Sequence, residues 1–171
     1  MLTLMLDGWL VWDGLYGPFH IGDEFLASVE FAPVSTPQAV EPGTHHSLRH
    51  LGGNRYAAVG LVHEAPQIRV LEVGKFRLVR WSRPDESADD ALVDGATVEL
   101  EAKLNLHPWA ESEWSRNAAS TYATEVRWRI DRITRFSVDG GDPTDVPECS
   151  IETVDSATQY CLLECVMLGE Q

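Results

Sequence analysis

Apolar and polar residues alternate along several stretches of this chain, a pattern typical of β-strands with one buried face. The clearest case is residues 96–106, where every second residue from Val98 to Leu106 is apolar and the residues between them are polar. Residues 24–31 follow the same rule, with Phe25 and Phe31 on the apolar face. Both stretches are therefore predicted to be half-buried strands.

Further strands are predicted where β-branched and aromatic residues run between turn signals. These runs are residues 2–12, interrupted at Asp7-Gly8, and residues 55–64, 67–73, 75–81, 121–138 and 157–168. One or two short helices are expected in addition, because Pro108 suits a helix start. The pattern predicts a mainly β fold, an antiparallel small barrel or sandwich of about seven strands.

The spacing of these elements indicates one domain over residues 1–171, a length that buries a sizeable core. Residues 32–54 are polar and contain three prolines, so they are predicted to be a mobile or functional loop. Residues 83–95 are predicted to be an acidic loop.

The chain has no run of 18 apolar residues, and its start lacks the basic region of a signal peptide. Its three cysteines argue against a disulfide framework, and one disulfide with one free thiol is the alternative. Cys161 and Cys165 are predicted to be small buried hydrophobes, since no basic residue is near them in the sequence. These features favour a soluble, cytoplasmic protein with no membrane association.

The formal charge is −14, and its distribution is uneven. Residues 1–48 and 136–171 contain no Lys or Arg, whereas all thirteen basic residues lie between them. Two purely acidic ends would attract a basic partner and repel phosphate backbones. The alternative is that the excess of acid serves solubility alone.

The leading hypothesis is therefore a binding module, not an enzyme, that takes a basic protein partner in the manner of an immunity or inhibitor protein. The acidic residues assigned to that surface are Asp23, Glu24, Glu30, Asp142 and Asp145. The sequence contains no Walker A phosphate loop, dinucleotide-binding glycine motif, nucleophile elbow or Cys-x-x-Cys pair.

A second hypothesis follows from the basic and aromatic residues of 127–135. Arg127, Arg129, Arg132 and Arg135 surround Trp128 in a predicted strand, a composition that single-stranded nucleic-acid binders use. The competing interpretation is that these arginines pair with the protein's own carboxylates. The net negative charge favours that interpretation over nucleic acid or another anionic ligand.

A third hypothesis is a metal-dependent enzyme built on histidines. His45, His46 and His50 lie in one predicted loop, and His63 ends the next strand. Imidazoles together with a carboxylate are Zn²⁺ ligands, but no spacing here matches a zinc motif, so no cofactor is predicted.

Six tryptophans are many for this length, and most are predicted to lie in the core. Trp109 and Trp114 lie in a polar segment and are the predicted candidates for an exposed contact surface.

The N-terminal pattern Trp9, Gly14, Gly17-Pro18-Phe19 and Gly22-Asp23-Glu24-Phe25 resembles the opening of an uncharacterised bacterial domain-of-unknown-function family. Gly43, His45-His46 and the run from Tyr56 to Val62 extend the resemblance. It covers the first third of the chain and implies a bacterial protein, but it implies no activity and no catalytic residue.

Overall fold

The computed structural model describes the whole chain except residues 66–67, 82–91, 107–120, 138–141, 154–158 and 169–171. The described residues form fourteen strands, β1–β14, and the short helix α1. The mainly β prediction is confirmed, but the count of about seven strands is wrong. Four of the strands have only two residues, which is too short for any alternation to show in the sequence.

The single predicted domain consists of two compact units in the structure. Unit 1 combines residues 1–26 with 126–171, and unit 2 comprises residues 27–125. Each unit is described by itself below.

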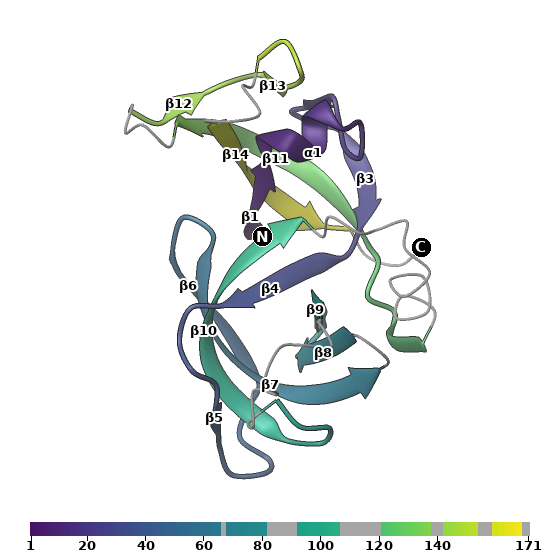
Figure 1. Ribbon diagram of the computed structural model, residues 1–171, viewed down its shortest axis with the longest axis vertical. Helices are drawn as coiled ribbons and strands as arrows, with labels where there is room; N and C mark the ends of the chain where they lie inside the picture. The colour runs from purple at the N-terminus through teal and green to yellow at the C-terminus, as the bar shows by residue number, and fades with distance from the viewer. Residues whose placement is uncertain (66–67, 82–91, 107–120, 138–141, 154–158, 169–171) are drawn as a thin grey trace. The chain divides into compact units, whose positions relative to one another are not determined.

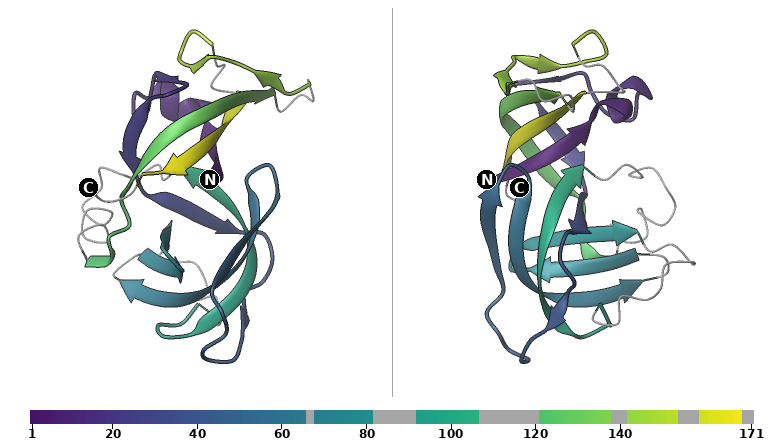
Figure 2. Two further views of the ribbon diagram at one scale, coloured as in Figure 1. Left: turned by 180° about the vertical axis from the view of Figure 1, so that it is seen from behind. Right: turned by 60° about the vertical axis from the view of Figure 1, so that its left-hand side comes forward.

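Unit 2 contains a closed barrel of five strands (Figures 1 and 2). The strands are β4 (Val29–Pro33), β7 (Arg55–Ala65), β8 (Ile68–Val73), β9 (Phe76–Trp81) and β10 (Thr97–Leu106). They pair in the ring β7–β8–β9–β4–β10, and β10 closes the ring on β7. All pairs are antiparallel except β4 with β9, which is parallel and corrects the expectation of a purely antiparallel barrel.

The barrel interior is filled by the apolar face of each strand. The prediction for residues 96–106 is confirmed, because all five apolar side chains of β10 are buried. Gly60 on β7 marks a close approach of two strands. A Cβ atom at Gly60 would lie 2.6 Å from the backbone oxygen of Glu72 and 2.8 Å from Cγ2 of Val73.

Residues 32–54 are not one long loop, since β5 (Gln38–Ala39) and β6 (Ser47–Gly52) lie within them. β5 pairs with β10, and β6 pairs with the first half of β7. The side chains of β6 are largely exposed and polar, so its sequence carries no alternation. The ladder to β7, which only the folded chain supplies, defines it as a strand. Most of the predicted acidic loop at 83–95 lies outside the described residues.

The outer face of β8 and β9 carries a second apolar cluster of Ile68, Val70 and Val79, against which Trp81 and Tyr122 pack. The predicted strand at 24–31 divides at Ser28 into β3 (Glu24–Ala27) and β4. The Ser28 and Thr124 hydroxyls, both buried, lie 3.1 Å apart and share a hydrogen bond.

Unit 1 is built on an antiparallel sheet in which β14 (Gln159–Met167) lies between β1 (Leu2–Asp7) and β11 (Val126–Ser137), as Figure 1 shows. β3 and β12 (Thr144–Asp145) also pair with β11. A separate ribbon joins β2 (Phe19–His20) to β13 (Glu148–Cys149). The core of unit 1 includes Leu4, Trp128 and Ile130, all almost fully buried.

Helix α1 (Gly8–Trp12) replaces the second half of the strand predicted at 2–12. β1 ends at Asp7, which is the N-cap of α1 with extended backbone angles. The apolar run from Gly8 to Trp12 has no polar residue to set a period of two, so its sequence does not distinguish helix from strand. No helix in the described part of the chain is long and apolar enough to cross a membrane.

Candidate functional site

Exposed large hydrophobic side chains are concentrated in unit 1. Of the nine in the described residues, only Val34 and Val93 belong to unit 2, although unit 2 is the larger unit. The other seven are Met1, Trp9, Trp12, Leu15, Ile21, Leu26 and Ile151. Single exposed apolar residues are ordinary, whereas exposed apolar residues that lie together mark a contact surface.

Three of these residues lie on α1 and the turn after it, and we call them the tryptophan face: Trp9, Trp12 and Leu15. Trp9 is 38% exposed, Trp12 54% and Leu15 41%. Trp9 and Trp12 are three residues apart, so they lie on the same side of the helix. Gly8, Leu10 and Val11 are buried, so α1 is attached to unit 1 by its other residues.

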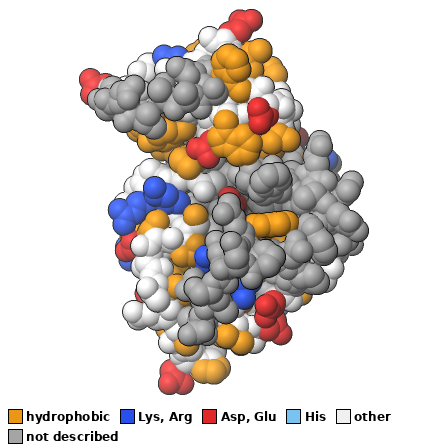
Figure 3. All heavy atoms as spheres, viewed as in Figure 1, with side chains coloured by type: hydrophobic (Ala, Val, Ile, Leu, Met, Phe, Trp, Pro, Cys, Tyr) orange, Lys and Arg blue, Asp and Glu red, His pale blue; other side chains and the backbone are white. Residues whose placement is uncertain are grey.

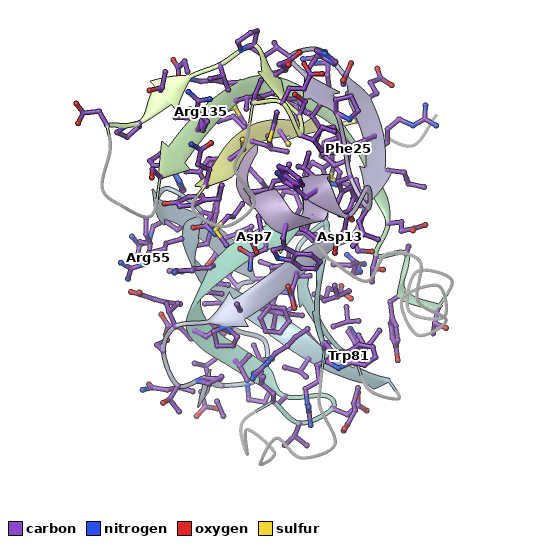
Figure 4. The ribbon with its side chains drawn as sticks, turned by 45° about the horizontal axis from the view of Figure 1, so that its top comes forward. Asp7, Asp13, Phe25, Arg55, Trp81 and Arg135 are labelled. Carbon is purple, nitrogen blue, oxygen red and sulfur yellow. The ribbon has the colours of Figure 1, made fainter. Side chains whose placement is uncertain are left out.

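An aspartate stands at each end of this helix. Asp7 is the N-cap residue, and Asp13 is the C-cap residue and is exposed. Figure 4 shows them on either side of α1, and Figure 3 shows orange side chains over this part of unit 1 with red ones beside them. An acid at a helix C-terminus opposes the helix dipole, so the charge of Asp13 is not there to stabilise α1.

Unit 1 as a whole is strongly acidic. Its sequence contains thirteen Asp and Glu against four Arg and no Lys, a formal charge of −9. All four arginines are on β11, so the rest of unit 1 has acids and no Lys or Arg.

These four arginines are the residues of the second hypothesis, and three of them lie close to carboxylates of unit 1. Arg132 contacts both Asp145 and Glu164. Arg129 Nε lies 3.1 Å from Asp131 Oδ1, and Arg127 Nη1 lies 3.9 Å from Glu24 Oε2. These contacts support the interpretation that the arginines of β11 pair with the protein's own acids.

A bulge in β11 decides which way these side chains face. The pairing with β14 shifts between Ile130 and Arg132, so Arg132 is exposed like Arg129, instead of alternating with it. Arg135 is half-buried, and its Nη1 donates a hydrogen bond to the backbone oxygen of Thr153 at 2.8 Å. The four arginines therefore do not form one basic surface.

The acidic candidates are divided by the fold. Asp23 and Glu24 lie beside the first half of β11, where the Ile130 amide donates to the Asp23 backbone oxygen. Asp145 lies at its second half, opposite Thr134. Asp142 is exposed just before β12, and Glu30 belongs to β4 in unit 2.

Asp145 is the candidate whose charge is most fully compensated. The hydrogen bond from Arg132 lowers the pKa of Asp145, and a hydrogen bond from Thr134 lowers it further. The same pair raises the pKa of Arg132. Among the other candidates of unit 1, Asp23 contacts His20 and Glu24 lies 3.9 Å from Arg127, so neither has the two-pronged arginine partner of Asp145.

The candidate histidines are not brought together as a metal site. His50 Nε2 lies 2.7 Å from the backbone oxygen of Gly53, and His63 Nε2 lies 3.1 Å from Glu72 Oε2. His45 and His46 precede β6. Among the residues that the structure describes, no group of three His, Cys, Asp or Glu is placed to hold a metal ion.

A polar network around His20 was not predicted. His20 Nδ1 lies 3.3 Å from Asp23 Oδ2, and His20 Nε2 lies 3.2 Å from Glu148 Oε2. The Ser150 hydroxyl donates to the other oxygen of Glu148 at 3.0 Å. The only signal in the sequence was the spacing of His20 and Asp23 at a Gly-containing turn, because the β2–β13 pairing brings in Glu148 from 128 residues away. This network links the two strands of the ribbon through His20 and Glu148.

The arrangement of the cysteines around Cys161 is the second feature that the sequence did not reveal. Cys149, Cys161 and Cys165 are all buried free thiols, as predicted for Cys161 and Cys165. The hydrogen bond from Cys149 lowers the pKa of Cys161, and the charge of Arg135 lowers it too, against the effect of burial. Arg135 reaches Cys161 because the two residues face each other across β11 and β14, not because they are near in sequence.

The chain matches no protein-family model, no curated protein and no solved structure. The resemblance of its first third to an uncharacterised bacterial family stays a prediction.

Proposed function

We propose that this chain is a binding module, not an enzyme, and that unit 1 binds a basic protein partner in the manner of an inhibitor or immunity protein. The observation that carries the proposal is the −9 charge of unit 1 together with the confinement of its arginines to β11. A surface of one sign attracts an oppositely charged partner and speeds its association.

Solubility alone explains the charge less completely than binding does. A solubilising surface avoids exposed apolar groups, whereas unit 1 carries seven exposed large hydrophobic residues alongside its acids. Apolar side chains at the centre and charged groups at the rim are the ordinary composition of a protein interface.

The two alternative functions have weaker support. An anionic ligand on β11 would have to compete with Asp145, Glu164, Asp131 and Glu24 for the arginines. A metal-dependent enzyme lacks a suitable ligand group within the described residues.

The test is native mass spectrometry of the untagged chain purified at low salt from its own cells. A one-to-one complex with a protein of high isoelectric point is the expected result. A bare chain, or a complex with an acidic protein or a nucleic acid, would overturn the proposal.

Matched charge variants identify the unit responsible. Asp23→Asn, Glu24→Gln and Asp142→Asn together remove three charges from unit 1, and the complex should then dissociate at lower salt. Glu41→Gln, Glu99→Gln and Glu125→Gln remove three charges from exposed positions of unit 2, and we expect that variant to behave like the wild type. Equal effects of the two sets would contradict binding by unit 1.

A further inference from the structure

We propose that the tryptophan face of α1 is the contact point of unit 1, and that it takes an apolar segment of the partner bearing Arg or Lys. This inference rests on the proposed function and specifies its site. The juxtaposition behind it is two exposed tryptophans, three residues apart on α1, with the exposed Asp13 at the end of their helix.

The packing of α1 leaves Trp9 and Trp12 exposed. Leu10 and Val11 are 2% and 3% exposed, so the buried side of α1 already attaches it to unit 1. Trp9 and Trp12 add large apolar rings to the outside of that attachment. Tryptophan is among the residues that contribute most to binding when a partner covers it.

The chemistry of the tryptophan face favours a segment that bears Arg or Lys. An indole ring attracts the guanidinium or ammonium group of Arg or Lys to its face. Asp13 supplies an exposed carboxylate at the end of the same helix, and a guanidinium binds a carboxylate through paired hydrogen bonds. Residues 1–48 contain no Lys or Arg that would repel such a segment.

A second copy of this chain is not the favoured occupant of the tryptophan face. Two tryptophan faces in contact would bring Asp13 of one copy, and the −9 charge of its unit 1, against the same charges of the other. Like charges in contact oppose association, whereas a basic segment is attracted by the same field.

The experiment uses the full chain and a synthetic 16-residue peptide of arginine and leucine patterned as an amphipathic helix. Binding is followed by the emission of the chain's tryptophans and by the anisotropy of dye-labelled peptide. Two control peptides separate the contributions: one replaces every arginine with citrulline, which is neutral, and the other replaces every leucine with serine. Binding that requires both arginine and leucine is the expected result.

Three face variants, Trp12→Ala, Asp13→Asn and Leu15→Ser, test the site, and two further variants are controls. Trp12→Ala should weaken binding about tenfold or more, and Trp12→Phe, which keeps an aromatic face, should stay within about threefold of wild type. Asp13→Asn and Leu15→Ser each test the face independently, so the result does not depend on Trp12→Ala remaining folded. Val93→Ala changes an exposed apolar residue of unit 2 and should leave binding unchanged.

The possible outcomes test the proposed binding site and the proposed function separately. Binding of the peptide to the wild type, with no loss in any of the three face variants, would overturn the site while a basic partner in native mass spectrometry still supports the function. No binding by the wild type, or equal binding of the citrulline peptide, would also overturn the site. A dimer that Trp12→Ala dissociates would show a second copy as the occupant and would contradict the proposal.

Discussion

Arg132 and Asp145 form a two-pronged ion pair between β11 and β12, with Nη2 2.8 Å from Oδ2 and Nε 3.1 Å from Oδ1. From the sequence alone, Asp145 is predicted in an acidic binding surface and Arg132 in a competing basic one. In the structure they satisfy each other. Glu164 lies 3.3 Å from the remaining side of Arg132, so this part of unit 1 is internally compensated.

The ion pair predicts how Asp145 titrates. The hydrogen bond from Arg132 lowers the pKa of Asp145 in the folded chain, so the pair stabilises the fold above the ordinary pKa of the carboxyl group. That contribution is lost as the pH falls through the lowered pKa. Arg132→Met should raise the pKa of Asp145 towards its ordinary value, as measured by carbon-13 NMR titration of the carboxyl group. Arg129→Met, which removes the contact with Asp131, is the control and should leave Asp145 unchanged.

The sequence was sufficient for the elements that alternate cleanly. β10 was predicted with its buried face correct, because Val98 to Leu106 bury every second side chain against the barrel interior. The parallel pairing of β4 with β9 could not be predicted, because no local pattern specifies which distant strands meet. The bulge beside Asp131 was also missed, so the side of the strand on which Arg132 lies was not foreseen.

The tryptophan face and the acidic charge of unit 1 could also be predicted only in part. The spacing of Trp9 and Trp12 is visible in the sequence, but the apolar run 8–12 suits a strand as well as a helix. The residues predicted for an exposed contact surface, Trp109 and Trp114, lie outside the described residues. The excess of acidic residues is visible in the sequence, whereas the pairing of individual acids with arginines depends on the strand register.

The buried hydroxyl pair of Ser28 and Thr124 predicts a coupled loss of stability. Ser28→Ala leaves the Thr124 hydroxyl, 1% exposed, without this partner, and should lower the free energy of unfolding by about 1–3 kcal/mol. Thr124→Val should have a similar effect. The double variant should lose less than the sum of the two, because no orphaned hydroxyl remains. Urea unfolding of the four proteins measures this cycle.

The control for that cycle is Ser47→Ala, which removes a hydroxyl from an exposed position of β6 and should change stability by less than about 0.5 kcal/mol. Strict additivity of the Ser28 and Thr124 substitutions would show that the two hydroxyls do not depend on each other.

Gly60 predicts an unusual response to alanine. Its φ is not in the left-handed region, so alanine is allowed by the backbone, and at an open strand position it would stabilise the chain slightly. Here the added methyl would meet the Glu72 oxygen at 2.6 Å, and Gly60→Ala should cost about 1–3 kcal/mol of the free energy of unfolding. Chemical denaturation measures the difference, and a stabilised variant would contradict the close approach of β7 and β8.

The three buried thiols should differ in reactivity. Burial raises the pKa of Cys165 to about 12, while Cys149 and Arg135 lower that of Cys161. The thiolate is the reactive form, so iodoacetamide should label Cys161 at lower pH than Cys165 when both are followed by peptide mass spectrometry. Cys149→Ala should raise the pH at which Cys161 is half-labelled, because it removes the thiol that donates to Cys161. Cys149→Ser keeps a donor and should raise it less.

Arg135→Met tests the electrostatic part of the same arrangement. It should raise the pH for half-labelling of Cys161, since the positive charge that favours the thiolate is gone. Cys165 is the internal control, because burial and the charge of Asp131 set its pKa, and its labelling should not change. Labelling of Cys165 before Cys161 in the wild type, or a shift of both cysteines in Arg135→Met, would show that local opening of the sheet controls access, and not the hydrogen bond between Cys149 and Cys161.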